Sequence, residues 1–538
     1  MKAFVVSIVN AAKHRQSLLA ERMNAASDAA LLLMLSLVYL VIRLLALPFF
    51  ELGGDIAHKW RFLRYFHETG IWFPAEVDHH QGRWIQNVPE LWLMDLFGTA
   101  DPWYYYILPI LTGWGVLILI YLIARLFTDR FRSALVFTMT ALFPTFISES
   151  GQLLPLMPAC LFTLLALYLM LRYLEKPTRL FLPLLAGVSM GLAWGGKVTV
   201  IYWCAGIGLF LLFFKVPGSK DLLVFRRFRL GRDTLLFAAG FLIVLAAETV
   251  LINRFFHVPW GRLSMLTGHT GDSPNHVQCG VIEYLLSIIV VPFYAKGKAL
   301  YIIPRYCIFL LTFPAVFLWL TRKDAPLRKK FLAFAFTVTL FLHCYMVVRV
   351  FPFKHPERHL LRYYLIMNSL GFVFFIAGWD EIVRWCGRWK PARFIPALCA
   401  TLLAFTTILG FFNNSLRNHD NLYWCLRNRR NIAVQRREKL PVLVSTHRAG
   451  KSLPLWYAIF GPTEGLPTVS REVEDLPCLY DARGKSYITG WGTPPPTGKP
   501  VKVLIIRENQ SWIKNAVFRG EQTENVRKRT EIPRNHNR

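Results

Sequence analysis

The chain has 538 residues, of which 54% are hydrophobic and 15% aromatic, and its formal net charge is +29. Its mean hydropathy is +0.36. This is more apolar surface than a soluble domain can bury, so the composition excludes a soluble protein and indicates a polytopic membrane protein. The Lys and Arg residues stand mostly in short connections between apolar runs, where they determine topology rather than bind nucleic acid.

Residues 1–28 carry Lys2, Lys13, Arg15 and Arg22 and predict a basic amphipathic helix on the cytoplasmic face of the membrane. Apolar runs then continue to residue 412, and several are shorter than the ~20 residues of a full span. Eleven runs are candidate spans: 29–50, 104–127, 134–147, 153–174, 180–194, 198–214, 234–252, 300–320, 331–351, 360–379 and 394–412. We therefore expect an all-α polytopic membrane protein of about eleven transmembrane helices over residues 29–412.

Basic residues gather at every second connection between these runs. They are Arg125, Arg130 and Arg132; Arg172, Lys176 and Arg179; Lys215, Lys220, Arg226, Arg227, Arg229 and Arg232; Arg322, Lys323, Arg328, Lys329 and Lys330; and Arg384, Arg388, Lys390 and Arg393. The positive-inside rule then places these connections in the cytoplasm and everything after residue 412 outside it. Arg43, near the outer end of the first run, is expected to snorkel to the interface rather than bind a lipid phosphate.

The first outer loop, residues 51–103, interleaves charged residues with tryptophans directly after the first span. Its first part holds Glu51, Asp55, His58, Lys59, Arg61, Arg64, Asp78, His79, His80 and Arg83. Such a mixture cannot lie in hydrocarbon, because each unpaired charge there is costly. We interpret it as the catalytic loop of a membrane enzyme, and the alternative is an interfacial loop with an aromatic belt.

The composition changes after residue 412. Pro and Gly separate short β-like runs such as 441–445 and 501–506, which predicts a small extracytoplasmic α/β domain over residues 413–520. Its basic residues favour either contact with anionic lipid or a solvated surface. Residues 521–538 are polar enough to form a disordered tail.

An enzyme with its polar cluster just outside a membrane helix, and with no nucleotide-binding Gly-rich loop in its sequence, is expected to use a substrate in the membrane. Lipid-linked sugar phosphates meet that requirement. Sugar transfer from such a donor needs a base for the acceptor hydroxyl and cations for the leaving phosphate. Asp55 is the candidate base, because Gly53 and Gly54 before it allow a sharp turn at the helix exit.

Six further residues of this loop are candidate substrate contacts: His58, Lys59, Asp78, His79, His80 and Arg83. The imidazoles beside Asp78 can bind a divalent cation, contact sugar hydroxyls or cap the local backbone. Because adjacent side chains point in different directions, His79 and His80 alone make a poor metal site, so no metal ligand is assigned and a divalent cation is left open. The fork of Arg83 suits a phosphate.

Two later stretches add cations. Lys197 lies between two apolar runs, where a charge is costly unless it binds an anion or reaches an interface; phosphate binding and a helix-end snorkel are both open. A second group follows the ninth run: Lys354, Glu357, Arg358, His359 and Arg362. It is either part of the site, with Glu357 orienting the cations, or an interfacial anchor. The loop over residues 254–283 is either a lid or a connector.

At four places the sequence resembles the GT-C superfamily of polyprenyl-phosphate-sugar-dependent glycosyltransferases, especially the protein mannosyltransferase-like branch that includes the lipid A aminoarabinose transferases. The first is an Asp, Asp55, that closes the first span and opens a long outer loop. The others are residues 134–174 with Phe143-Pro144, Ser148-Glu149-Ser150 and Leu154-Pro155; the Gly-Leu-Ala…Lys signature at Gly191 to Lys197; and Phe353 to His359 followed by Arg362-Tyr363-Tyr364.

The resemblance implies a GT-C-like fold and an inverting transfer with Asp55 as the general base. Where the family commonly has an Asp-Glu pair, this chain has Asp55-Ile56, and Glu149 is the nearest match to the acidic residue at the start of the fourth helix. It also implies a polyprenyl-phosphate sugar donor, a glycolipid, lipopolysaccharide or envelope glycan acceptor, and the lipid bilayer as partners.

The leading interpretation is therefore a membrane glycosyltransferase of the bacterial inner membrane, with a cytoplasmic N-terminus and a periplasmic C-terminal domain. The endoplasmic reticulum is the alternative location. Two other functions stay open. A lipid-linked glycan transporter or flippase should place ionisable residues at mid-membrane and show inverted repeats. An O-antigen ligase or polymerase would use a diphosphate-linked oligosaccharide instead of a monophosphate-linked monosaccharide.

Overall fold

The structure is a computed structural model. It describes residues 17–48, 81–98, 105–218, 220–225, 228–257, 299–345, 364–392 and 394–438. It also describes short segments at 59, 63–64, 66–70, 261–262, 277–278, 282, 285–286, 354–355, 442–444, 479–481 and 504–506.

The chain forms two compact units. The first comprises Met1–Leu44, Phe62–Phe97 and Tyr104–Phe411, and the second comprises Leu45–Arg61, Gly98–Trp103 and Phe412–Arg538. Each unit is described by itself.

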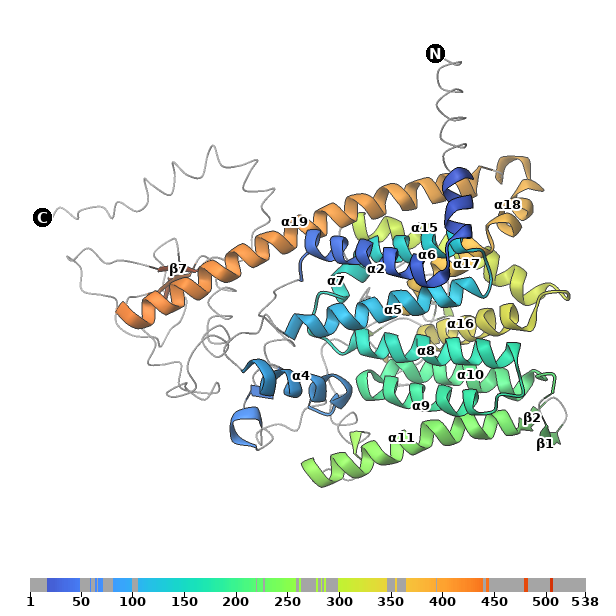
Figure 1. Cartoon of the computed structure of the whole chain (residues 1–538), viewed down its shortest axis with the longest axis horizontal. Coiled ribbons are helices and arrows are strands. Elements are labelled where there is room, and N and C mark those ends of the chain that lie inside the picture. The colour runs from blue at the N-terminus through green and yellow to red at the C-terminus, as the bar shows by residue number, and fades with distance from the viewer. Residues whose placement is uncertain are drawn as a thin grey trace, which may run out of the picture. The chain divides into compact units, whose positions relative to one another are not determined.

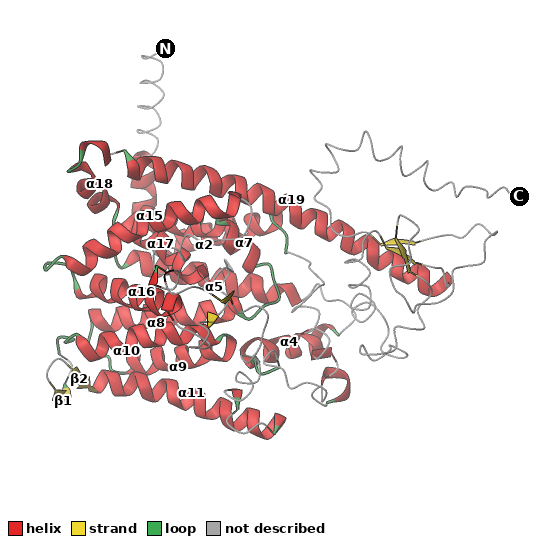
Figure 2. Cartoon of the chain, turned by 180° about the vertical axis from the view of Figure 1, so that it is seen from behind, coloured by secondary structure: helices red, strands yellow, loops and turns green. Residues whose placement is uncertain are grey.

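The first unit is a bundle of helices (Figures 1 and 2). Its helices are α2 (Asp28–Leu45), α4 (Trp84–Phe97), α5 (Ile107–Arg125), α6 (Arg130–Leu142), α7 (Pro144–Glu149), α8 (Leu156–Glu175), α9 (Phe181–Gly196), α10 (Ile201–Phe213), α11 (Arg232–Phe256), α15 (Ala299–Thr321), α16 (Leu327–Tyr345), α17 (Leu365–Ala377), α18 (Trp379–Gly387) and the first part of α19 (Ile395–Glu438). Helix α9 packs against both α8 and α11, α10 packs on α16, and α15 packs on α17.

Each of the eleven predicted apolar runs overlaps a helix: α2, α5, α6, α8, α9, α10, α11, α15, α16, α17 or α19. Among the described residues, 6 helices are long and apolar enough to cross a membrane: α2, α5, α8, α11, α15 and α19. Helices α17 and α18 meet this criterion together, with a bend of 67° between them, and α9 and α10 are shorter apolar helices. The expected fold class is therefore confirmed: the chain is a multi-pass, helical membrane protein.

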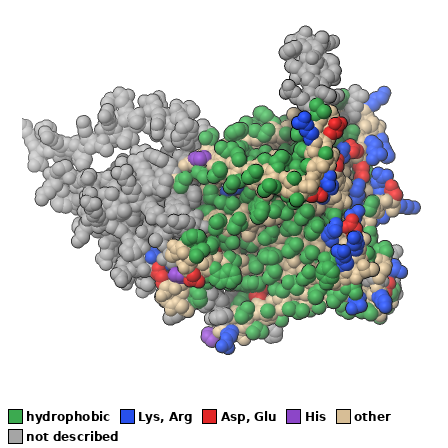
Figure 3. Space-filling model, viewed as in Figure 1, with side chains coloured by type: hydrophobic (Ala, Val, Ile, Leu, Met, Phe, Trp, Pro, Cys, Tyr) green, Lys and Arg blue, Asp and Glu red, His purple; other side chains and the backbone are tan. Residues whose placement is uncertain are grey.

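Apolar side chains cover the visible side of the bundle (Figure 3). Leu33 on α2, Val250 on α11 and Phe405 on α19 are 66%, 65% and 60% exposed. Contiguous apolar surface of this extent is rare on soluble monomers. Hydrocarbon solvates such side chains, while the helices satisfy their own backbone hydrogen bonds. This surface therefore faces lipid.

Charged side chains gather at one end of the bundle (Figure 3). Three ion pairs join connections that are distant in the sequence: Arg328 with Glu175 (3.2 Å), Lys329 with Glu381 (2.8 Å) and Arg132 with Asp380 (2.9 Å). The basic connections after α5, α8 and α15 and the helix α18 thus lie at the same end, as their alternation along the sequence predicts. We call this the basic end.

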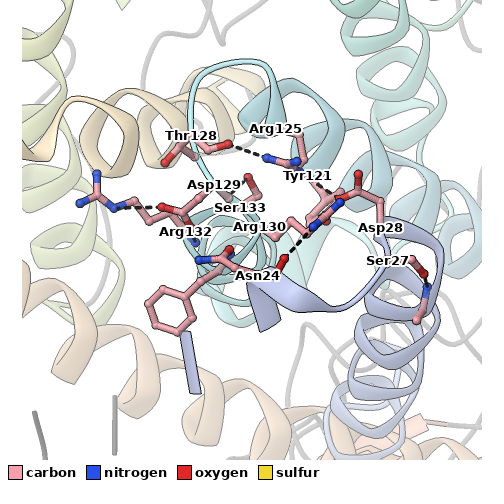
Figure 4. A network of polar contacts seen from close by, with 12 residues as sticks. Asn24, Ser27, Asp28, Tyr121, Arg125, Thr128, Asp129, Arg130, Arg132 and Ser133 are labelled. Carbon is pink, nitrogen blue, oxygen red and sulfur yellow. Dashed lines mark hydrogen bonds and ion pairs between the residues drawn. The ribbon is translucent and has the colours of Figure 1, made fainter. Parts of the chain in front are cut away.

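Asp28 fastens the start of α2 to the connection between α5 and α6 (Figure 4). Its Oδ1 accepts hydrogen bonds from Tyr121 Oη at 2.7 Å, Arg125 Nε at 3.0 Å and Arg130 Nε at 3.2 Å. Arg130 also donates to the carbonyl of Asn24 at 2.6 Å. A carboxylate in the first turn of a helix is favoured by the helix dipole. The basic connection between α5 and α6 is therefore held to the start of α2 by specific hydrogen bonds.

Glycines allow α9 and α11 to approach closely. A Cβ at Gly187 would overlap the carbonyl oxygen of Phe237, and a Cβ at Gly240 would overlap the carbonyl oxygen of Leu184. In a membrane, helices associate through van der Waals contact between small residues, because lipid removes the hydrophobic drive for association. This contact places the end of α9 against α11.

In the second unit, α19 continues to Glu438, well beyond the predicted end of its apolar run at residue 412. Within this unit Asn418 Nδ2 donates to the carbonyl oxygens of Ala46 at 2.9 Å and Leu47 at 2.6 Å. The backbone that leads from α2 toward the predicted catalytic loop is therefore held by the helix.

Three short strands follow, β5 (Val442–Val444), β6 (Leu479–Asp481) and β7 (Leu504–Ile506), and they form a parallel sheet in the order β6-β5-β7. Strands β5 and β7 lie within the β-like runs predicted at 441–445 and 501–506. The limits of the predicted domain at 413–520 and the predicted tail at 521–538 lie largely outside the described residues and stay predictions.

The contact between α9 and α11 predicts that Gly240→Ala destabilises the protein by about 1–3 kcal/mol, because the new methyl group must push the helices apart. Gly208→Ala on α10 is the matched control, since a Cβ there meets nothing within 4 Å, and it should be neutral or slightly stabilising. Thermal unfolding of the purified proteins in detergent measures both. Equal melting temperatures for the two variants would contradict the predicted contact.

Candidate functional site

Buried polar side chains gather toward the end of the bundle opposite the basic end. Helices α9, α11 and α16 start at the basic end and finish here, and α15 and α17 begin here. The buried or half-buried polar residues in this region are Arg43, Glu149, Lys197, Glu248, Arg262, Arg305, His343 and Asn368. We call this region the polar end.

The structure describes five of the residues predicted from the sequence. Nine lie outside the described residues: Asp55, His58, Asp78, His79, His80, Glu357, Arg358, His359 and Arg362. Lys59 is buried in the second unit. Arg83 is half-buried directly before α4, and Lys354 belongs to β4 (Lys354–His355). Glu149 and Lys197 both lie in the first unit.

Glu149 is the last residue of α7, a helix of six residues. Phe143 has an extended backbone that ends α6, and Pro144 starts α7 with the preset backbone angle that suits a first helical position. The chain then turns toward α8. Glu149 is buried, so these turns carry its carboxyl group into the bundle.

Lys197 stands where α9 ends. Its backbone is extended, with φ −150° and ψ 131°, and a 3-10 turn, Val198–Val200, follows before α10. The side chain lines a small cavity of about 20 Å³ together with Cys160 of α8, which has room for about one water molecule. The other polar side chains that line the cavity belong to Thr199, Tyr202, Thr339 and His343.

Glu149 and Lys197 lie in the same region of the bundle. Lys197 shares its cavity with Cys160 of α8, and Gly196 packs against the carbonyl of Pro155, in the connection that leads from Glu149 to α8. Glu149 and Lys197 come from α7 and from the end of α9, and nothing in their sequence separation indicates that they share a region. The tertiary structure therefore brings two separately predicted residues into one region.

Aromatic rings and an arginine continue the cluster beyond the cavity. The guanidinium of Arg305 lies 3.9 Å from the ring centroid of Tyr364, and the ring of His343 lies 4.8 Å from the same ring. A cation over an aromatic face is stabilised even when it is desolvated. Asn368 is buried nearby on α17, and its side-chain amide has no hydrogen-bond partner among the described residues.

Sequence reasoning missed Arg305, His343 and Asn368, because each lies inside a run counted as an apolar span. An ionisable residue within an apolar run was a usable signal, since such residues commonly face the interior of a bundle and mark functional sites. A hydropathy average hides that signal.

Arg43 also differs from its prediction. Instead of snorkelling to the interface it is buried, and its Nη1 donates to the carbonyl of Ile147 and to Oγ of Ser150, both at 3.2 Å. A cation near carbonyls at the end of a helix is favoured by the helix dipole. Arg43 therefore holds the end of α7 against α2 on either side of Glu149.

Glu248 and Arg262 form a buried ion pair that the sequence did not predict. Arg262 Nη1 lies 3.5 Å from Glu248 Oε1, and both side chains are almost fully buried. Arg262 also donates to the backbone carbonyls of Trp194 and Gly196 at the end of α9. Burial lowers the pKa of Arg262 and Glu248 opposes that shift. The pair fastens α11 to the backbone directly before Lys197.

The two glycines before Lys197 have a packing role. A Cβ at Gly195 would lie 2.8 Å from the indole of Trp84, and a Cβ at Gly196 would lie 3.1 Å from both Ile85 and the carbonyl of Pro155. Since α4 begins at Trp84, the first outer loop packs its helix directly on this part of α9.

Two predicted outer loops meet in a short ladder. Strand β3 (Val277–Gln278) pairs with β4 in antiparallel fashion, with Val277 opposite His355 and Gln278 opposite Lys354. The loop predicted as a lid or connector is therefore joined to the start of the second predicted cationic group. The rest of that group lies outside the described residues.

The described residues contain no group of three or more His, Cys, Asp or Glu side chains arranged to hold a metal ion. The sequence Asp78-His79-His80 is not among them, so the divalent cation left open above stays untested.

The buried ion pair predicts a large effect of removing one partner. Arg262→Met leaves Glu248 buried without its counter-ion and should cost about 3–5 kcal/mol. The double variant Arg262→Met/Glu248→Gln removes both charges and should recover much of the loss. Melting temperatures in detergent and the rate of limited proteolysis report the difference. A single variant as stable as the double would contradict the pairing.

Comparisons with known proteins support the resemblance. The family model described as dolichyl-phosphate-mannose-protein mannosyltransferase matches residues 84–225, about a quarter of the chain. A search of curated proteins finds no match.

Solved structures are similar at low identity. ArnT from Cupriavidus metallidurans bound to undecaprenyl phosphate is 14% identical, with 80% of this chain and 85% of that chain covered and a TM-score of 0.48. The oligosaccharyltransferase AglB from Archaeoglobus fulgidus, in complex with an inhibitory peptide and a dolichol-phosphate, is 13% identical over 80% of this chain, with a TM-score of 0.44. This chain spans 63% of the length of that one.

The matched segment contains α4, the turn at Glu149 and the Gly-Leu-Ala…Lys stretch that ends at Lys197. Two of the four motifs that carry the resemblance in the sequence thus lie inside it. Residues 84–225 therefore have the sequence pattern of the dolichyl-phosphate-mannose-protein mannosyltransferase family, which confirms the predicted resemblance to polyprenyl-phosphate-sugar-dependent glycosyltransferases.

Proposed function

We propose that the protein is an integral membrane glycosyltransferase that moves a sugar from a polyprenyl-phosphate donor to an acceptor outside the cytoplasm. One observation carries this proposal. The segment that matches the mannosyltransferase family, residues 84–225, contains both Glu149 and Lys197.

The reaction is a displacement at the anomeric carbon of the donor sugar. The acceptor hydroxyl forms a new bond to that carbon while the bond from the carbon to the phosphate oxygen breaks, which inverts the configuration. Asp55 takes the proton of the hydroxyl, and polyprenyl phosphate leaves with the bonding electrons. General bases of this kind contribute about 10²–10⁴-fold to a rate. Glu149 is the second proposed carboxylate, and it orients groups of the site from within the bundle.

The departing phosphate gains negative charge, so cations near it lower the barrier. Lys197 is the best-supported of these cations, because Arg262, Trp84 and the glycines before it hold its backbone from several sides. Lys197 lines a cavity with room for about one water molecule, and its ammonium group is proposed to contact the phosphate.

The sequence supplies the remaining proposed contacts. His58, Lys59, Arg83, Lys354, Arg358, His359 and Arg362 are proposed to bind the phosphate or the sugar, with Glu357 orienting the later cations. Asp78, His79 and His80 are proposed to contact sugar hydroxyls.

Orientation follows from charge. The basic end holds most of the Lys- and Arg-rich connections, and such connections stay in the cytoplasm. We therefore infer a cytoplasmic N-terminus and a polar end that faces the periplasm of a bacterial inner membrane. The acceptor is then a glycolipid, lipopolysaccharide or envelope glycan on the outer face.

A lipid-linked glycan transporter is the second candidate, and one observation favours it. Arg305 and His343 are buried within apolar helices, a placement that is common along transport pathways. The two functions differ in product. A transferase releases free polyprenyl phosphate from its donor, whereas a transporter moves the intact donor across the membrane.

If Asp55 is the general base, Asp55→Asn should lower turnover about 100-fold or more. The affinity for the donor should stay within about twofold of that of the unmodified protein. Release of undecaprenyl phosphate from undecaprenyl-phosphate sugars measures turnover, and native mass spectrometry with undecaprenyl phosphate measures binding. Asp324→Asn is the control, because Asp324 is exposed at the basic end and bridges Arg322 two residues away. Undiminished turnover in Asp55→Asn would remove Asp55 from the role of base.

The role of Lys197 gives a separate prediction. Lys197→Met should weaken binding of undecaprenyl phosphate about tenfold, which is 1.4 kcal/mol, while Lys197→Arg keeps the charge and should retain part of the affinity. Lys176→Met, an exposed lysine at the basic end, is the matched control and should bind as the unmodified protein does. Identical affinities for Lys197→Met and Lys176→Met would exclude phosphate binding by Lys197.

A further inference from the structure

A two-stranded hairpin extends from the basic end between α10 and α11 (Figure 1). It consists of β1 (Asp221–Phe225) and β2 (Phe228–Gly231), paired in antiparallel fashion. Neither the composition of this connection nor its run of basic residues predicted strands.

The register gives the hairpin two different faces. Residues directly opposite each other share a face, and faces alternate along a strand. Leu223 lies opposite Leu230 and Phe225 opposite Phe228, which makes one face wholly apolar.

The other face carries charge. Val224 lies opposite Arg229, and Arg229 Nη1 pairs with Asp221 Oδ2 at 3.2 Å. This second face thus combines Val224, which is 53% exposed, with an ion pair across the strands, so it is the more polar of the two faces.

The apolar face is strongly exposed. Leu223, Phe225 and Phe228 are 62%, 65% and 49% exposed among the described residues. A lone two-stranded hairpin is marginally stable in water and requires a surface to pack against. The apolar face of the hairpin therefore requires an apolar environment, either lipid or another protein, that shields it from water.

The position of the hairpin indicates whether lipid or protein contacts this apolar face. The ring of Phe228 lies 4.8 Å from the ring of Phe213, the last residue of α10. Phe213 is 41% exposed, and Leu235 in the first turn of α11 is 44% exposed. The apolar face of the hairpin therefore continues the lipid-facing surface of the two helices that it joins, which is an argument for lipid and against a soluble protein.

The basic residues around the hairpin also favour contact with lipid. Lys220 is exposed next to β1, Arg229 lies within β2 and Arg232 directly follows it. The sequence adds Arg226 and Arg227 between the strands. Basic residues at a membrane surface attract anionic lipid headgroups, at about 1 kcal/mol per residue.

We propose that this hairpin lies in the interface of the leaflet at the basic end, with Leu223, Phe225 and Phe228 among the upper acyl chains and its basic residues at anionic headgroups. Interfacial elements bind in this way through an apolar face at the acyl boundary and cations on the polar side. The hairpin is thus a lipid-binding element whose role is independent of the sugar transfer proposed above.

The test places a reporter on each face of the hairpin in the full-length protein. Leu223→Cys and Val224→Cys are labelled with an environment-sensitive fluorophore and reconstituted in nanodiscs, and the unmodified protein, labelled in parallel, supplies the background from native cysteines. Adjacent strand residues point to opposite faces, so the second variant is the matched control. Gel-filtration profiles identical to that of the unmodified protein confirm that both variants fold.

The label at residue 223 should be quenched about twofold or more strongly by shallow doxyl phospholipid than the label at 224, and less by aqueous iodide. Equal quenching of both labels by iodide would overturn the proposal and indicate a face open to a soluble partner. Replacing phosphatidylcholine by a mixture with phosphatidylglycerol should increase the lipid quenching at 223. No change between the two lipids would overturn the role given to the basic residues.

Discussion

Charge is unstable in a low-dielectric interior unless it is paired, and this constraint determines where the ionisable groups of the helical unit lie. At the basic end, carboxylates such as Asp28 and Glu381 form ion pairs with arginines and lysines from connections that are far apart in the sequence. At the polar end the pairing is different for each cation. Arg262 has Glu248, Arg305 has an aromatic ring, and Arg43 has helix carbonyls. Each cation is thereby fixed in place, and its neighbours are fixed with it.

The end of α9 is where these restraints converge. Gly187 brings α9 against α11, Gly195 brings it against Trp84 of α4, and Arg262 binds its last carbonyls. Lys197 comes immediately after, so the position of its backbone is set by contacts from three other parts of the chain. The same stretch therefore serves both packing and the proposed binding of phosphate, and substitutions in it will change stability and activity together unless they are made at Lys197 itself.

The two ends of the bundle meet the bilayer in different ways. At the polar end, buried polar side chains line the interior around Cys160 and Tyr364. At the basic end, the charges face outward and the hairpin of β1 and β2 presents an apolar face beside them. At one end the polar side chains lie inside the bundle, and at the other end an apolar face lies beside exposed charges. Both arrangements suit a protein that draws its substrate from the lipid and keeps a fixed orientation in it.

Hydropathy and charge determined most of the fold without a structure. Every predicted apolar run overlaps a helix, because a chain in hydrocarbon must satisfy its backbone hydrogen bonds within each segment. The Lys- and Arg-rich connections lie together at one end, and the resemblance through residues such as Glu149 and Lys197 was readable as a motif. The continuation of α19 to Glu438 was not, since hydropathy marks where a helix leaves the membrane and not where it ends.

Unlike the helices, the contacts within the candidate site could not be predicted from the sequence. Three sets of contacts join residues from different parts of the chain: the cavity shared by Lys197 and Cys160, the pair of Glu248 with Arg262, and the hydrogen bonds of Arg43 to α7. Arg305 likewise stacks on Tyr364. Sequence alone determined which residue types were available for a site. Only the tertiary structure decided which of them meet, because helix packing sets the distances between side chains that are remote along the chain.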